Sequence, residues 1–268
     1  MKMQVCSDLH LDINIKNESD EKLPKIFEYF VKPNPDCDCL ALVGDIAEEH
    51  SPIYYKFLIW VSHQFKKVFI ITGNHEYYSC DSITNVHERI KKFCNGTNLC
   101  FLNNEKSLFS IGNVTYHILG STLWSNISKE SEMECVMGLN DFKYISPKMS
   151  TNDYNGMHKV SVDGLTFEIR EFEKLDQTKN KLIVLTHHAP LIKGVSHPRY
   201  ESQKVRGMNE CFSTDLSAIV RKPVSVWVFG HTHWCSDFVH EGCNVVSNCW
   251  GYGGEVRGKY KTTKILEI

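Results

Sequence analysis

The stretch Cys39-Leu40-Ala41-Leu42-Val43-Gly44-Asp45 decides the fold of this chain. Its first five residues form a continuous apolar run of strand length, which is the pattern of a strand covered on both faces. The run ends in a glycine and an aspartate, so a carboxylate stands where the strand gives way to a loop. The stretch therefore predicts a buried strand that presents an acidic group at its carboxyl end.

The same arrangement occurs four more times along the chain. In each case an apolar run is followed at once by a short polar motif. These motifs are Ser7-Asp8-Leu9-His10, Gly73-Asn74-His75-Glu76, Thr186-His187-His188-Ala189-Pro190 and Gly230-His231-Thr232-His233. One such motif is unspecific, but five in this order, each with a strand in front of it, form a specific signal.

Strands and helices alternate in the first third of the chain. Apolar residues at helical spacing predict helices over 22–31, 54–65 and 82–93, with Ser82 as the N-cap of the third. Strands are predicted at 3–6, 39–43 and 67–71, and a loop at 11–20. This order predicts a parallel sheet, in which ligands bind at the carboxyl ends of the strands. The first three motifs are therefore expected to converge on one crevice.

The rest of the chain is richer in strands. A hairpin with its turn at 112–113 is predicted between strands 108–111 and 114–119. Further strands are expected at 100–102, 181–186, 224–229, 238–239, 244–247 and 263–268. The remaining segments are interpreted as helices at 164–175 and 214–221 and a loop at 191–210.

Residues 121–163 break this regular pattern. A segment this long inside a compact domain is usually functional. We interpret it as a partly helical, cap-like insertion that lies over the crevice, within a single domain that spans residues 1–268.

Composition excludes several classes of protein. Apolar content of 42%, charged content of 23% and a net charge of −2 are ordinary for a soluble globular protein and give no general attraction to nucleic acid or to an anionic membrane. No apolar run has the length of a signal peptide or a membrane span. The eleven cysteines are scattered through apolar segments, which favours free thiols. We therefore expect a cytoplasmic protein.

The motifs combine Asp, Asn and His without Cys. Such side chains suit Mn²⁺, with Fe and Zn²⁺ as alternatives, and do not suit a structural thiolate zinc site. Two cations about 3.5 to 4 Å apart can clamp a phosphoryl group. The chain offers seven ligands, and eight contacts if Asp45 bridges the pair: Asp8, His10, Asp45, Asn74, His187, His231 and His233.

Together, the five motifs resemble those of the calcineurin-like metallophosphoesterase family. The resemblance runs from residue 7 to about residue 233. It implies an α/β fold, a four-layer α/β/β/α sandwich of two mixed sheets flanked by helices. It also implies one cation held by Asp8, His10, Asp45 and His233, and a second held by Asp45, Asn74, His187 and His231.

The family resemblance further implies a reaction. A hydroxide that bridges two divalent metal ions would attack phosphorus in line with the leaving group, so no side chain serves as nucleophile. His75 corresponds to the family's catalytic histidine, close to the leaving-group oxygen. Glu76 is expected to orient His75. The implied activity is that of a metal-dependent phosphoric ester hydrolase, a phosphodiesterase or a phosphatase.

Several alternatives stay open. His188 competes with His187 as the ligand of the fourth motif; otherwise His188 contacts substrate or simply packs. His197 and Arg199 of the following loop are further candidates for contact with substrate. The substrate is expected to be a small phosphodiester or phosphomonoester, such as a nucleotide. A protein phosphatase, a nuclease and a non-catalytic scaffold of the same fold are the alternatives. The native metal and the oligomeric state are not determined by the sequence.

Overall fold

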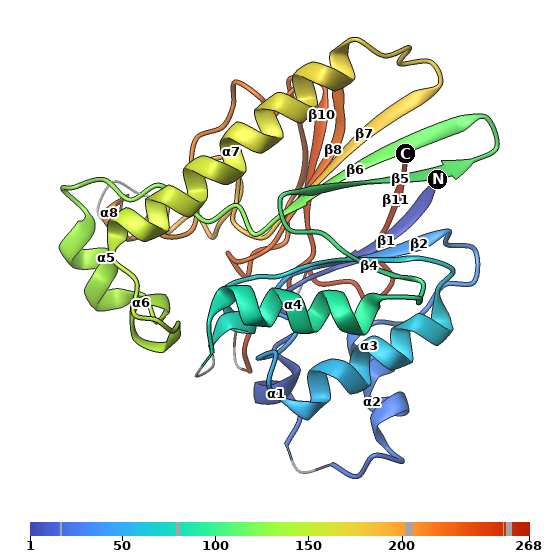
Figure 1. Ribbon diagram of the computed structural model, residues 1–268, viewed down its shortest axis with the longest axis horizontal. Helices are drawn as coiled ribbons and strands as arrows, with labels where there is room; N and C mark the ends of the chain where they lie inside the picture. Colours follow the sequence, from blue (N-terminus) through green and yellow to red (C-terminus); the bar gives the residue numbers. More distant parts are fainter. Residues whose placement is uncertain (17, 79–80, 202–205, 254, 256–258) are drawn as a thin grey trace.

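Two β-sheets lie face to face, and helices cover their outer faces (Figure 1). The computed structural model describes residues 1–16, 18–78, 81–201, 206–253, 255 and 259–268. Both sheets are mixed, since each combines parallel and antiparallel pairs. This arrangement confirms the predicted four-layer α/β/β/α sandwich.

The first sheet has the strand order β11-β1-β2-β3-β4. Its four N-terminal strands are parallel, as the alternation of strands and helices predicts, and β11 adds an antiparallel edge. Helices α2, α3 and α4 cover its outer face (Figure 1). The elements are β1 (Lys2–Cys6), α2 (Leu23–Phe30), β2 (Cys39–Val43), α3 (Pro52–Gln64), β3 (Val68–Ile71), α4 (Ile83–Cys94), β4 (Leu99–Phe101) and β11 (Ile265–Glu267).

The second sheet has the strand order β5-β6-β7-β8-β10-β9. Strands β5 and β6 form the predicted hairpin, with Ile111 opposite Val114. The long helix α7 (Thr151–Glu173) crosses the outer face of this sheet (Figure 1). The strands are β5 (Glu105–Ile111), β6 (Val114–Ser121), β7 (Asn180–Thr186), β8 (Val224–Phe229), β9 (Asp237–His240) and β10 (Cys243–Ser247).

Strand β2 shows why the sandwich has four layers. Its five residues are all buried. Cys39, Ala41 and Val43 face the layer between the two sheets, where they join Ile183 and Leu185 of β7. Leu40 and Leu42 point the other way, into the core beneath the helices. Because successive side chains of a strand point to opposite faces, only an uninterrupted apolar run can fill both cores.

Helix α7 begins at Thr151, so the predicted start at residue 164 is wrong. Ser150 caps the helix: its hydroxyl accepts the Asp153 N–H at 3.2 Å, and the Asp153 carboxylate accepts the Ser150 N–H at 2.9 Å. Gly156 and Gly164 weaken the helical signal in the sequence. Packing overrides this weakness, because residues at spacings of three and four form one buried stripe: Tyr154, His158, Ser161, Leu165, Ile169 and Phe172.

Two other predictions of local structure are also wrong. Residues 214–221 form irregular backbone with one turn instead of a helix, because the N–H groups of Thr214 and Leu216 donate to the carbonyls of Ala189 and Pro190. The expected loop at 11–20 contains a short helix, α1 (Leu11–Asn14), whose first residue is buried. Residues 202–205 of the loop predicted at 191–210 lie outside the described residues; α8 (Arg206–Asn209) follows them.

Residues 121–163 contain two further helices, α5 (Glu132–Gly138) and α6 (Asp141–Tyr144). Figure 1 shows α5, α6 and α8 grouped at one end of the molecule. The segment is thus partly helical, but its last part belongs to α7, which continues beyond residue 163. That the segment acts as a cap within one domain of residues 1–268 remains a prediction.

The ten cysteines among the described residues are free. None of the described helices combines the length and the apolarity that a membrane span requires.

Candidate metal centre

The five motifs meet at one edge of the sandwich. Asp8, Asp45 and Asn74 follow β1, β2 and β3 of the first sheet, whereas His187 and His231 follow β7 and β8 of the second. Backbone hydrogen bonds join the motifs, from Asp8 N–H to Gly44 O at 3.0 Å and from Gly230 N–H to His187 O at 2.9 Å. The site is therefore built across both sheets.

The backbone at this edge is strained. Five of the seven predicted cation ligands have positive φ angles, between 42° and 67°. Residues other than glycine rarely adopt this region, and they persist there only when the surrounding contacts demand it. The five are Asp8, His10, Asp45, His231 and His233. Such strain is typical of functional sites.

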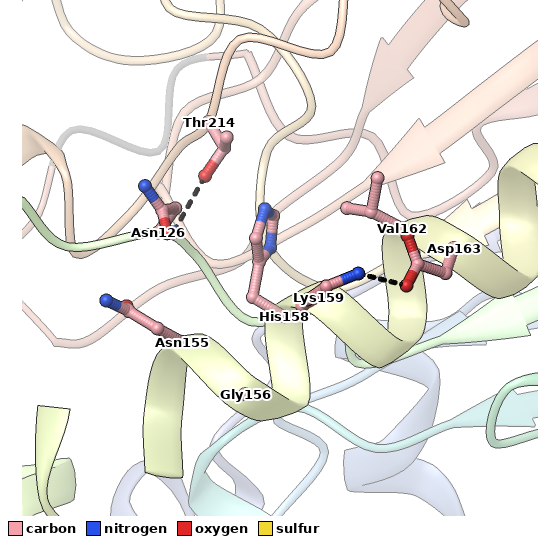
Figure 2. Close-up of a pocket in the computed structure, with 8 residues that line it drawn as sticks. All are labelled: Asn126, Asn155, Gly156, His158, Lys159, Val162, Asp163 and Thr214. Carbon is pink, nitrogen blue, oxygen red and sulfur yellow. Dashed lines mark hydrogen bonds and ion pairs between the residues drawn. The ribbon is translucent and has the colours of Figure 1, made fainter. Parts of the chain in front are cut away.

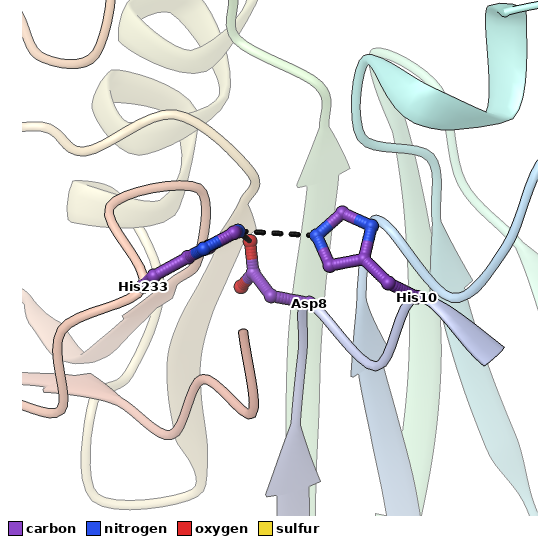
Figure 3. Close-up of side chains that lie close together, drawn as sticks. All are labelled: Asp8, His10 and His233. Atoms are coloured by element: carbon purple, nitrogen blue, oxygen red, sulfur yellow. Dashed lines mark hydrogen bonds and ion pairs between the residues drawn. The ribbon is translucent and has the colours of Figure 1, made fainter. Parts of the chain in front are cut away.

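Two sets of side chains bring together atoms that could bind a cation, and we call them the donor groups. The first consists of Asp8, His10 and His233 (Figure 3). Nε2 of His10 and Nε2 of His233 face each other at 3.1 Å, and Asp8 Oδ1 lies 3.4 Å from the latter. Nδ1 of His233 donates to the Glu255 carboxylate at 2.7 Å. A neutral His233 therefore turns a lone pair toward the group, as a metal ligand does.

A second group consists of Asp45, His187 and His231. Nδ1 of His187 donates to Val43 O at 2.9 Å, which leaves Nε2 to face Asp45 Oδ2 at 3.3 Å and Asn74 Oδ1 at 3.1 Å. Nε2 of His231 is buried and has no hydrogen-bond partner among the described residues. His10 Nε2 lies 3.8 Å from Asp45 Oδ2, so Asp45 lies beside both groups.

The second group needs a positive charge at its centre. If His187 is neutral, three electron-rich atoms converge without a hydrogen between them: its Nε2, Asp45 Oδ2 and Asn74 Oδ1. A proton or a cation must separate them. Burial by itself lowers the pKa of His187, but the Asp45 carboxylate raises it to about 10. The side chains thus fit a cation.

Two glycines make room for this convergence. A Cβ on Gly73 would lie 2.1 Å from Asp45 Oδ1 and 2.7 Å from His187 Cε1. A Cβ on Gly44 would lie 2.5 Å from His187 Nδ1, and Gly44 has a φ of +84°. Larger residues at either position would displace the donor atoms.

His75 lies against the donor groups, where it forms a third cluster with His10 and Asp45. Its ring is 4.4 Å from that of His10, and its Nε2 is 2.8 Å from the hydroxyl of Tyr252. Its backbone N–H donates to Asp45 Oδ1 at 2.8 Å, which ties its position to the shared carboxylate. The sequence reasoning missed Tyr252, which lies beyond the last motif in Gly251-Tyr252-Gly253 and does not directly follow the strand β10, which ends at Ser247.

Glu76 does not orient His75 in the expected way. Its carboxylate accepts the backbone N–H groups of Asp45, Ile46 and Gly73, at 3.0, 2.8 and 2.7 Å. Nδ1 of His75 is buried without a hydrogen-bond partner among the described residues. Burial raises the pKa of Glu76 to about 8 despite these N–H donors. Its observed contacts hold the second and third motifs together.

The structure separates the roles of the two histidines in the fourth motif. His188 Nδ1 donates to Thr122 O at 3.1 Å, and its Nε2 accepts from the Tyr154 hydroxyl at 2.9 Å. Both ring nitrogens of His188 are thus used by the protein, whereas Nε2 of His187 faces Asp45. The geometry favours His187 as the ligand and gives His188 a packing role.

The loop after the fourth motif reaches the site through other residues than expected. The His197 ring packs on Trp234, with ring centres 5.0 Å apart, and the Arg199 guanidinium lies 4.3 Å from the centre of the Tyr200 ring. Among the described residues, Ser196 and Tyr200 line the pocket beside the donor groups, and His197 and Arg199 do not.

The pocket over the donor groups has a volume of about 430 Å³. Its walls come from the motifs, from residues 138–140, from the region of α8 and from Tyr252. A larger groove of about 1410 Å³ adjoins it. The residues common to both are His75, Tyr78, Asn140 and Tyr252.

A separate hollow of about 510 Å³ lies against α7 (Figure 2). His158 Nδ1 donates to Leu123 O at 3.0 Å, and Lys159 pairs with Asp163 at 2.5 Å. None of its described lining residues belongs to the donor groups. Substitutions in this hollow are therefore expected to leave the donor groups unchanged.

The family description of calcineurin-like phosphoesterases matches residues 1–235, which include all five motifs. The chain belongs to the calcineurin-like phosphoesterase family. A viral relative, the uncharacterized protein L509 of Acanthamoeba polyphaga mimivirus, is 31% identical over 284 residues, which cover 99% of this chain and 96% of the relative.

Solved structures share the phosphoesterase fold. The phosphopantetheinyl hydrolase of Mycobacterium tuberculosis has a TM-score of 0.73 at 16% identity, with 100% of this chain and 95% of that chain covered. A dimetal phosphatase from Danio rerio has a TM-score of 0.53 at 13% identity, with 92% and 86% covered. At these identities the likeness concerns the fold alone.

Proposed function

We propose that this calcineurin-like phosphoesterase is a dinuclear-metal enzyme that hydrolyses small phosphodiesters or phosphomonoesters. The observation that carries the proposal is the convergence of Asp45 Oδ2, Asn74 Oδ1 and His187 Nε2 next to His75. A cation satisfies these atoms together, and His10 of the group Asp8, His10 and His233 lies 3.8 Å from the same Asp45 oxygen.

The family residues divide into two cation sites that share Asp45. One would be held by Asp8, His10, Asp45 and His233, the other by Asp45, Asn74, His187 and His231. Two bound cations would supply a hydroxide nucleophile at neutral pH and neutralise charge on the phosphoryl oxygens. Their oxygen and nitrogen ligands suit Mn²⁺, Fe or Zn²⁺.

The protein's own groups act on the leaving group. His75 borders both the pocket and the groove, so it can deliver a proton to an ester oxygen that leaves toward the groove. The Tyr252 hydroxyl at 2.8 Å holds the ring in place until substrate enters. In-line displacement then places the leaving group on the groove side of phosphorus.

The groove has room for a substantial leaving group. Lys143 and Lys148 line it, and within the described part of the chain neither forms an ion pair. Arg89 also lines the groove, where it binds both Glu49 and Asp81 and so offsets much of their charge, and the Glu48 carboxylate lies 3.4 Å from His50 Nε2. These lysines favour a leaving group that carries a negative charge, as a nucleotide does.

The double substitution Lys143→Ala and Lys148→Ala tests this assignment. For a diester whose aryl leaving group carries a phosphate, KM is expected to rise about fivefold, since each exposed contact contributes roughly 0.5 kcal/mol. KM for bis-p-nitrophenyl phosphate is expected to stay unchanged. The matched control is Lys159→Ala, which removes a lysine from the separate hollow (Figure 2). An equal rise for both substrates would contradict the assignment.

The proposed function is tested by a screen of mono- and diesters, including cyclic nucleotides. The protein is freed of metal, reloaded with Mn²⁺, Fe²⁺ or Zn²⁺, and assayed with and without chelator. Chelator-sensitive hydrolysis of a small ester supports the proposal. No turnover with any metal, together with tight binding of a protein partner, would favour a scaffold. Cleavage of nucleic acid with a steep salt dependence would favour a nuclease, and preference for phosphoproteins would favour a protein phosphatase.

We also propose a cytoplasmic location. The ten described cysteines are free, and most of them are buried in the cores. Free thiols in this number are typical of a reducing compartment.

A further inference from the structure

We propose that Asp141, in the inserted segment, positions Asn74 and thereby completes the second cation site. This inference rests on the dinuclear centre of the proposed function. Asp141 opens helix α6, far in sequence from any of the five motifs, and no part of its side chain is exposed. The insertion would thus contribute to the metal centre itself and not only to the walls of the pocket.

The contacts of Asp141 are short and specific. Its Oδ1 accepts a hydrogen bond from Asn74 Nδ2 at 2.7 Å and another from the Tyr78 hydroxyl at 2.5 Å. Asn74 Nδ2 also donates to the Tyr78 oxygen at 3.0 Å. The three side chains form a closed triangle, in which both N–H groups of the Asn74 amide have an acceptor.

This triangle determines which end of the Asn74 amide faces the cation. A carboxamide has a donor end and an acceptor end of nearly equal shape, so rotation by half a turn exchanges them. With the N–H groups held by Asp141 and Tyr78, Oδ1 must point to His187 and Asp45. Without an acceptor at residue 141, the amide is free to present its N–H groups, which repel a cation.

The same carboxylate fixes a neighbour of His75. The Tyr78 ring packs on the His75 ring with centres 4.2 Å apart and an angle of 33° between the planes. Because the Tyr78 hydroxyl donates to Asp141, the insertion holds this ring against His75. One buried side chain thus supports both a cation ligand and the proton donor.

A buried carboxylate is a costly means of packing. Oδ2 of Asp141 is buried and has no hydrogen-bond partner among the described residues. Desolvating such an acceptor disfavours the folded state, and an apolar side chain of similar size would avoid the cost. A role in positioning Asn74 accounts for a polar residue where packing alone favours leucine.

The test compares Asp141→Leu with Asp141→Asn in metal-free protein titrated with Mn²⁺ by calorimetry. Leucine keeps the branched shape, although its methyl groups are larger than the carboxylate oxygens, and it removes the acceptor. One of the two binding steps is expected to weaken about 10- to 100-fold, as for other residues that orient metal ligands. Asparagine retains an oxygen that can accept from Asn74 and Tyr78, so it is expected to preserve both steps. Asp141→Ala provides a second acceptor-free variant if the leucine protein does not fold.

The structural control is Asp153→Ala. Asp153 caps α7, and its loss destabilises this helix, whose first turns belong to the insertion, without touching Asn74. Both Mn²⁺ steps are expected to remain in this variant. Wild-type affinity for two Mn²⁺ ions in an acceptor-free Asp141 variant would overturn the inference and leave the proposed function standing. A wild-type protein that binds no Mn²⁺, Fe²⁺ or Zn²⁺ would overturn both.

Discussion

Replacing Asp45 with asparagine is expected to abolish the dinuclear centre. Asp45 lies beside both donor groups, and the facing imidazoles of His187, His75 and His10 outweigh burial and hold its pKa well below the usual range. Asparagine keeps the size of the side chain but removes the charge that two cations share. With roughly 4 kcal/mol of transition-state stabilisation lost, hydrolysis is expected to fall at least about a thousandfold.

The measurement pairs kcat/KM with metal content. The Asp45→Asn protein is expected to retain fewer than two Mn²⁺ per chain after reloading, whereas the wild type retains two. Asp163→Asn serves as the control, because it neutralises an exposed acid on α7 that pairs with Lys159 and with no other described residue. Two tightly bound ions and full activity in the Asp45 variant would show that this carboxylate does not bridge.

Replacing His75 with alanine is expected to slow hydrolysis without emptying the cation sites. General acid catalysis contributes about 10²- to 10⁴-fold, and the contribution grows as the leaving group becomes more basic. The loss is therefore expected to be small for p-nitrophenyl esters and large for alkyl esters. The measurement is kcat/KM across aryl and alkyl diesters of increasing leaving-group pKa.

Two observations separate this role from a structural one. The Mn²⁺ content of His75→Ala is expected to equal that of the wild type, since the metal sites have other ligands. Tyr252→Phe removes the hydroxyl that contacts His75 Nε2 but keeps the ring, so it is expected to preserve the dependence on the leaving group. A loss of equal size for every ester would contradict proton donation by His75.

The alternation of strands and helices predicted the parallel first sheet, and the family resemblance implied the sandwich. The apolar run of β2 predicted a strand buried on both faces, and its alternate residues do fill two different cores. The sequence was not sufficient to place the start of α7. Gly156 and Gly164 lower the intrinsic helical preference, and only packing against Trp124 and the second core restores it.

The candidate site also has features that the sequence predicted and others that only the tertiary structure showed. The residues of the motifs could be read from the sequence because each stands at a strand end, and strand ends converge in any sheet of this kind. The choice between His187 and His188 could not be made from the sequence, because it depends on which imidazole contacts Tyr154 and Thr122. The contacts of Glu76 likewise depend on how three loops approach one carboxylate.

By itself, the sequence determined which side chains gather at the sheet edge, because periodicity and spacing are local properties of a chain; the order of the motifs carried the family resemblance, and that resemblance implied the architecture. Only the tertiary structure brought Asp141 to Asn74 and Tyr252 to His75, across 67 and 177 residues of sequence. These contacts follow no repeat or motif. They arise because an irregular insertion and a C-terminal loop fold back over the same edge, where burial leaves each polar group few partners.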